Sequence, residues 1–226
     1  MRSKLIVILT FIIILIFFNK NIVQYFIIKK LSYWTENEVE LKLQKINFFS
    51  GIILIDQFKI KNKKNFFYKN IFESKNIQIE LNLKTILSNL VEINKLIIND
   101  PKLYIEIKNI KKSKKNKIKD NLELIEKLSD NNKPKEYPPK NKDKNFIILK
   151  MSIQNSQAFI KHKKDKENIE IKLSDMQFSM VGNAGKNGTK NFLHFKDVIR
   201  IILNDIFFRI PDENLRTIIK ENYKIK

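Results

Sequence analysis

The feature that most constrains the fold is a strict alternation of apolar and polar side chains, clearest in the segment "IQIELNL" from Ile77 to Leu83. Aliphatic side chains occupy every second position, and polar side chains fill the positions between them. Because successive side chains of a strand point to opposite faces, this segment predicts a strand with one hydrocarbon face and one polar face. The hydrocarbon face needs a cover, which is either the protein's own core or an apolar ligand.

The same alternation runs from Glu38 to Lys108 and predicts several strands joined by short connections. The connections are expected at Ser50-Gly51, at a loop containing Phe66 and Phe67, at Lys84–Leu90 and at Asp100-Pro101. Asp-Pro favours a turn because proline fixes one backbone angle and has no donor for the strand ladder.

A strand–turn–strand unit occurs twice, as "INKLIINDPKLYI" and as "ILKMSIQNSQAFI", at an offset of 55 residues. The two copies align at apolar positions and at the turn: Ile93 with Ile148, Leu96 with Met151, Ile98 with Ile153, Ile105 with Ile160, and Asp100-Pro101 with Asn155-Ser156. Repetition of this kind predicts one long sheet built from similar units.

An apolar run from Leu5 to Phe18 follows the basic residues Arg2 and Lys4. As a helix it reaches about 21 Å, short of the ~30 Å hydrocarbon core of a bilayer. Small residues for signal-peptidase cleavage are lacking before Ser32, and continuation of the helix to Ile28 gives a segment long enough to span. We therefore expect an uncleaved signal anchor, with a buried core helix as the alternative.

Two other regions depart from the strand pattern. Residues 109–145 are rich in lysine and proline, with a short amphipathic helix expected in "NLELIEKLSD". Towards the C-terminus, apolar residues at helical spacing predict a helix that Pro211 ends and a second helix capped by Asp212.

The predicted fold is mainly β with some α: an N-terminal transmembrane helix, then a long curved antiparallel sheet of trough-like shape, with a short inserted helix and a C-terminal helical pair. The segments are residues 1–30 (signal anchor), 31–108 (first β segment), 109–145 (insert), 146–185 (second β segment) and 186–226 (C-terminal helices).

Composition argues against several function classes. The lysines behind the net charge of +20 are spread over nearly every polar position, as a gene rich in AT codons would produce. The strands also lack aromatic platforms flanked by basic residues. For both reasons no nucleic-acid partner is expected. The absence of cysteine excludes disulfides and thiolate chemistry. His162 and His194 have no partner at metal-ligand or triad spacing, and acidic residues are scattered singly. We therefore expect no enzyme activity, no metal and no cofactor.

The segment from Val39 to Lys108 resembles the N-terminal region of AsmA-like proteins, relatives of TamB and of the chorein-type lipid-transfer proteins. The resemblance rests on the anchor, on the strand pair in "KINFFSGIILIDQFKIKN", on the loop Asn62–Phe66, and on "IQIELNLKTILS" followed by "VEINKLIINDPKLYIE". With the insert and the next strand pair, it covers about residues 5–180.

The resemblance implies a bacterial inner-membrane protein, single-pass with a cytoplasmic N-terminus and a periplasmic bulk. It would take part in lipid transport or outer-membrane biogenesis through an open apolar trough that the C-terminal helices partly plug. The partners of the protein would be membrane lipids, whose phospholipid acyl chains bind in the trough. The candidate lipid-facing residues are Ile77, Ile79, Leu81, Leu83, Ile93, Leu96, Ile98, Leu103, Ile105, Ile107, Ile148, Met151 and Ile153.

Two main alternatives remain open, and a third and weaker one is a basic nucleic-acid binder. In one, the helices close the sheet completely and the apolar face is an ordinary core. In the other, the protein is an envelope scaffold that binds a protein partner through a sheet edge and carries no lipid.

Overall fold

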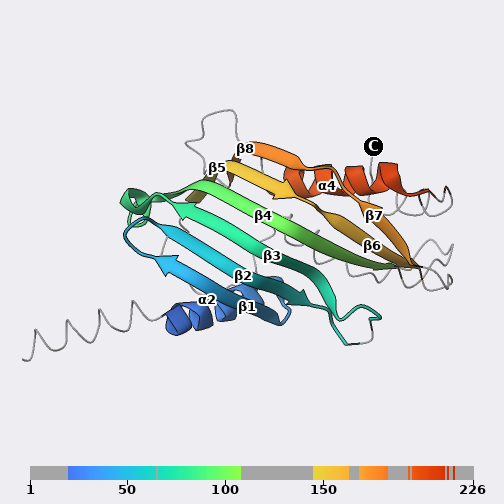
Figure 1. Cartoon of the computed structure of the whole chain (residues 1–226), viewed down its shortest axis with the longest axis horizontal. Coiled ribbons are helices and arrows are strands. Elements are labelled where there is room, and N and C mark those ends of the chain that lie inside the picture. Colours follow the sequence, from blue (N-terminus) through green and yellow to red (C-terminus); the bar gives the residue numbers. More distant parts are fainter. Residues whose placement is uncertain are drawn as a thin grey trace, which may run out of the picture.

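The computed structural model describes residues 20–64, 66–107, 145–162, 168–182, 193, 195–211, 213 and 216. Within them, most residues belong to one large sheet, with two α-helices against it (Figure 1). The strands are β1 (Val39–Asn47), β2 (Ile52–Lys61), β3 (Asn70–Leu81), β4 (Leu90–Ile107), β5 (Asn145–Gln154), β6 (Gln157–His162), β7 (Ile169–Lys172) and β8 (Met176–Gly182). The helices are α2 (Lys20–Thr35), the short 3-10 helix η1 (Leu83–Thr85) and α4 (Phe195–Arg209).

The sheet is mixed, so the expectation of a wholly antiparallel sheet is wrong. Strands β1 to β4 are antiparallel neighbours, but the far edge of β4 pairs in parallel with β5 along its first half and with β6 along its second half. Strands β8 and β7 then pair in antiparallel fashion with β5 and β6. Parallel neighbours need a long crossover, and the residues between Ile107 and Asn145 supply the length.

The predicted repeat is confirmed, and its two copies lie side by side. Ile93 pairs with Ile148, Ile98 with Ile153 and Ile105 with Ile160, at the offset of 55 seen in the sequence. The expected turn at Asp100-Pro101 is wrong, because β4 continues through these residues. The equivalent Asn155-Ser156 does interrupt the second copy, between β5 and β6.

A row of backbone irregularities crosses the sheet at the level of Asp100. Asn76 of β3 (φ 53°), Asp100 of β4 (φ 49°) and Asn155 between β5 and β6 (φ 55°) have positive φ, a conformation that Asn and Asp tolerate better than most residues. The Asn99 side-chain amide donates to the Asn76 carbonyl at 2.8 Å, and the Asn155 backbone N–H donates to the Asp175 carboxylate at 2.8 Å. Irregularities of this kind bend and twist a sheet, and we call this row the bend.

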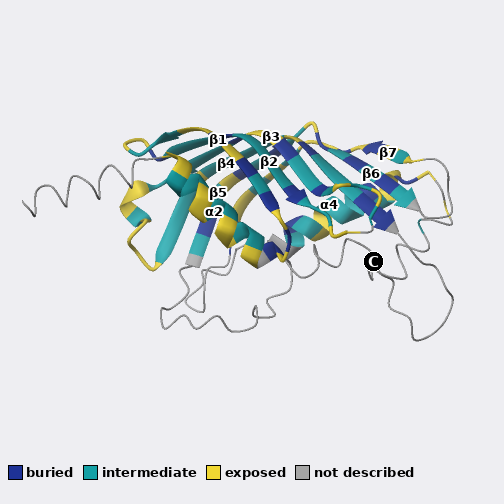
Figure 2. Ribbon diagram, turned by 90° about the horizontal axis from the view of Figure 1, so that it is seen from below, coloured by how far each residue is buried: buried dark blue, intermediate teal, exposed yellow. Residues whose placement is uncertain are grey.

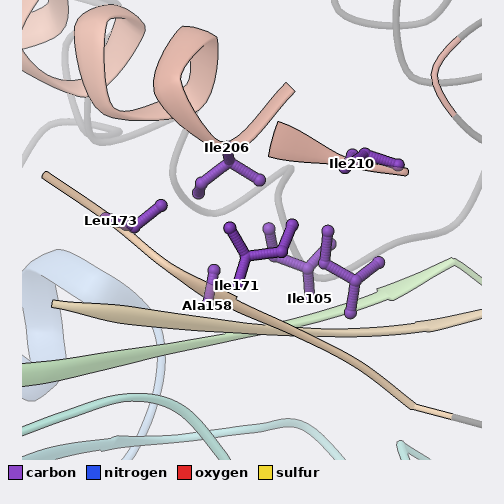
Figure 3. Close-up of a cluster of buried hydrophobic side chains, with 7 residues drawn as sticks. Ile105, Ala158, Ile171, Leu173, Ile206 and Ile210 are labelled. Carbon is purple, nitrogen blue, oxygen red and sulfur yellow. The ribbon is translucent and has the colours of Figure 1, made fainter. Parts of the chain in front are cut away.

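Both helices lie on the same face of the sheet, which we call the inner face (Figure 2). Helix α2 packs beside β1, and its Ile27, Ile28 and Leu31 contact the buried side chains of β1 to β3. Helix α4 covers the other end of the sheet. Its Val198 and Ile206, and Ile210 just after it, are buried against the sheet, and Figure 3 shows the last two.

Residues 20–28, expected as the end of a membrane span, belong to a helix that continues to Thr35 and packs on the sheet. Among the described residues, no helix is long and apolar enough to cross a bilayer. The run Leu5–Phe18, the insert helix and most of the second C-terminal helix lie outside the described residues. As predicted, α4 ends shortly before Pro211.

Candidate functional site

The predicted lipid-facing residues divide into two groups according to what covers them. Five are buried in protein: Ile77, Ile105, Ile148, Met151 and Ile153. Ile105 packs with Ile206 of α4 and with Ile210, which follows that helix (Figure 3), and Ile77 packs in the cluster that α2 covers. For these five residues the protein itself supplies the cover.

The second group lies between the two helices and is only half-buried. Leu96 and Ile98 contact both the cluster beneath α2 and the cluster beneath α4, which places them in the middle of the inner face. With their half-buried neighbours they form what we call the apolar strip: Ile53, Ile79, Leu81, Ile93, Leu96 and Ile98.

Three predicted residues fall outside both groups. Leu103 is half-buried and packs against the cluster under α4. Leu83 is exposed, beyond the end of the strip. Ile107 ends β4, and its side chain lies outside what the structure describes.

An apolar tip lies at one end of the sheet and is formed by Phe49, Leu83, Ile86 and Leu87, of which sequence reasoning identified only Leu83. These side chains belong to the β1–β2 and β3–β4 connections, and Phe49 and Leu87 are 89% and 91% exposed. The sequence did carry a signal for this tip: the bulky apolar residues Ile86 and Leu87 lie inside the predicted connection Lys84–Leu90, where polar residues are usual.

The two connections of the tip are held together through Gly51. The Leu81 N–H donates to the Gly51 carbonyl at 2.9 Å. Gly51 has φ +71°, and a Cβ at this position would lie 2.3 Å from the Leu81 carbonyl oxygen. Only glycine allows so close an approach in this backbone conformation.

Helix α2 begins at the end of the sheet that carries the tip. The Gln24 side chain accepts from the Leu43 N–H at 2.9 Å, whereas Ser32, nearer the helix end, accepts from the Val39 N–H at 3.0 Å. The helix therefore runs antiparallel to β1, and its first residue, Lys20, lies towards the β1–β2 connection (Figure 1).

The same two hydrogen bonds occupy backbone donors along the outer edge of β1. At the opposite side of the sheet, Leu193 forms a bridge with Val181 of β8, where the Gly182 N–H donates to the Leu193 carbonyl at 3.1 Å. These contacts reduce the number of backbone groups that an added partner strand could use at the edges formed by β1 and β8.

The outer face, opposite the helices, carries aromatic side chains flanked by lysines, so the expectation that the strands lack such platforms is wrong. Tyr104 and Phe159 stack with ring centroids 5.1 Å apart, and Lys102 lies 5.9 Å from the centre of the Phe159 ring. Lys161 lies 3.6 Å from the centre of the Phe67 ring. Burial, together with a hydrogen bond to Glu73, raises the pKa of Tyr104.

Across the described part of the chain, no group of three or more His, Asp or Glu side chains is placed to hold a metal ion. His162 ends β6, and His194 lies outside the described residues. Comparison of the chain with protein-family models, with curated proteins and with solved structures gave no match in any of the three.

Proposed function

We propose that the protein is a membrane-anchored, AsmA-like protein of the bacterial envelope that takes acyl chains of membrane lipids onto its apolar strip, in lipid transport or envelope biogenesis. The observation that carries this proposal is the half-buried state of the strip between two regions of fully buried core. A sheet closed by its own helices would bury these central positions most deeply, because they lie farthest from the edges.

The size of the strip suits an acyl chain. On β4 the strip runs from Ile93 to Ile98, which spans about 17 Å at ~3.3 Å per residue. One leaflet of a bilayer contributes about half of the ~30 Å hydrocarbon thickness. A chain laid along the strip would gain roughly 0.8 kcal/mol for each methylene group that it removes from water.

The apolar tip offers a route from the membrane to the strip. It lies at the end of the sheet where α2 begins, and in the sequence α2 follows the apolar run Leu5–Phe18 after a single residue, Asn19. Exposed apolar side chains of this kind insert into the boundary between headgroups and acyl chains. From Leu83 at the tip, Leu81 and Ile79 of β3 lead towards the middle of the strip.

Other features of this end fit the proposed attachment. Tyr25 and Phe26, in the first half of α2, are more than half exposed, and aromatic side chains of this kind favour membrane interfaces. Lys20, Lys45 and Lys84 are exposed nearby and would favour anionic headgroups. In this arrangement the N-terminus is cytoplasmic and the sheet lies in the periplasm.

The scaffold alternative has less support. Binding through a sheet edge needs free backbone donors and acceptors, and the edges of β1 and β8 already use part of theirs within the chain.

The test is the lipid content of the full-length protein after extraction in a mild nonionic detergent. We expect phospholipid to co-purify with the wild type, less of it with Ile79→Asp, and an unchanged amount with Gln78→Asp, which places the same carboxylate on the outer face of the same strand. Equal lipid content in the two variants and the wild type would contradict the proposal.

A further inference from the structure

The outer face contains a cavity of about 660 Å³ at the bend, on the side of the sheet opposite the apolar strip. Four lysines from different strands line it, Lys59 of β2, Lys75 of β3, Lys102 of β4 and Lys172 of β7. We call it the lysine cavity. Its volume lies in the range of ~300–1,000 Å³ that is usual for sites of small ligands.

Strand register places three of the lysines in one straight row across the sheet. Lys59 pairs with Glu73, Glu73 with Lys102, Lys102 with Gln157, and Gln157 with Lys172. Adjacent strands lie about 4.8 Å apart, so these lysines recur about every 10 Å across the row. Lys75 stands two residues further along β3, and its long side chain can reach the same space.

Glu73 stands between Lys59 and Lys102, and both of its carboxylate oxygens are hydrogen-bonded to other residues. One of its carboxylate oxygens accepts a hydrogen bond from the Tyr104 hydroxyl, and the other accepts from the Asn70 side-chain amide at 3.2 Å. Within the described part of the chain, none of the four cavity lysines forms an ion pair, whereas Lys42 and Lys61, also strand lysines, both do.

The lining of the cavity therefore carries four lysines against two acidic residues, Glu73 and Asp100. Gln57 and Gln157 add side-chain amides that can both donate and accept hydrogen bonds. Lysine binds phosphate as a point charge, and amides suit the hydroxyl groups of a polyol or sugar.

We propose that the lysine cavity binds a ligand that carries a phosphate group together with hydroxyl groups. Such a ligand is either a soluble phosphate ester or the headgroup of a phospholipid or glycolipid. The site is separate from the apolar strip, and the inference holds whether or not the strip binds acyl chains.

The test is calorimetric titration of the full-length protein, in a nonionic detergent at low ionic strength, with glycerol 1-phosphate. We expect Lys59→Gln/Lys102→Gln to weaken binding about tenfold or more, because it removes two charge-assisted contacts. The matched control is Lys69→Gln/Lys150→Gln, which removes the same charge from exposed positions outside the cavity and should leave the affinity nearly unchanged. Asp100→Asn should strengthen binding, because it removes a negative charge from the lining.

A second arm identifies the source of the phosphate. The same variants are assayed for binding to vesicles of phosphatidylglycerol and of phosphatidylcholine. A preference for phosphatidylglycerol that Lys59→Gln/Lys102→Gln abolishes and the control retains would support a lipid headgroup, whereas titration by glycerol 1-phosphate without that preference would support a soluble ester. The inference is overturned if the wild type binds neither probe, or if the control pair loses as much binding as the cavity pair.

Discussion

Placing a carboxylate on the inner face distinguishes an open strip from a closed core. The two positions to compare are Ile79, half-buried in the strip, and Ile105, which is 2% exposed beneath α4. Both are isoleucines of central strands, on the same face of the same sheet. The variants Ile79→Asp and Ile105→Asp therefore differ mainly in what covers the new carboxylate.

The magnitudes follow from the packing around each residue. Ile105 lies among Ile160, Ile206 and Ile210, each at most 2% exposed, so loss of its side chain alone costs about 2–5 kcal/mol. An unpaired buried carboxylate adds several kcal/mol more. The sum approaches the ~5–15 kcal/mol that stabilises a typical domain, so Ile105→Asp should not fold.

For Ile79 the expected loss is smaller, about 1–2 kcal/mol, because only part of the side chain is removed from water and the carboxylate can reach solvent. Thermal unfolding of the full-length protein in detergent, followed by circular dichroism, measures both variants. Ile79→Ala and Ile105→Ala separate the loss of hydrocarbon from the effect of the charge. If Ile79→Asp unfolds as completely as Ile105→Asp, the inner face is a closed core and the argument for an open strip fails.

Three further predictions concern the bend, the tip and the β1 edge. Asn155→Gly should leave stability nearly unchanged. Asn155→Val should cost about 1–2 kcal/mol, because a β-branched residue resists positive φ. Equal melting temperatures of the two variants would show that the bend does not depend on this conformation. Gly51→Ala should lower the free energy of unfolding by more than ~1 kcal/mol, since its Cβ would lie 2.3 Å from the Leu81 carbonyl oxygen; an unchanged denaturant midpoint would contradict this. Lys61 approaches Glu40 to 2.6 Å, and its hydrogen bond lowers the pKa of the Glu40 carboxyl. The ion pair therefore stabilises the fold at pH values above the usual pKa of a glutamate. This contribution is lost as the pH falls through the lowered pKa. Lys61→Gln should raise the pKa of Glu40 towards its usual range in an NMR titration, and an unshifted titration curve would rule the ion pair out.

Part of the fold could be predicted from the sequence because strand alternation and the repeat are local patterns. The offset of 55 between "INKLIINDPKLYI" and "ILKMSIQNSQAFI" predicted a sheet of similar units, and it coincides with the register in which β4 pairs with β5 and β6. It did not give the direction of pairing, since two similar strands can be parallel neighbours or separate hairpins. The Asp100-Pro101 turn was predicted from local preferences, and pairing on both sides of β4 overrode them.

The candidate sites could be predicted less well. Periodicity identifies which residues share the inner face, but the division into buried and half-buried residues depends on where α2 and α4 lie along it. The lysine cavity depends on register across five strands, because Lys59, Lys102 and Lys172 are far apart in the sequence. In a chain with 44 lysine and arginine residues, nothing local distinguishes these three from the others.

The most direct test of the central claim is site-specific photo-cross-linking in living cells. Benzoylphenylalanine is placed at Leu81, on the apolar strip, and in a separate variant at Glu80, the next residue of β3, whose side chain lies on the outer face. After irradiation, the purified protein is analysed by mass spectrometry for covalently attached lipid. We predict a phospholipid adduct at position 81 and none at position 80. Absence of lipid at both positions, or equal labelling of the two, would contradict the claim that the inner face of this sheet holds acyl chains.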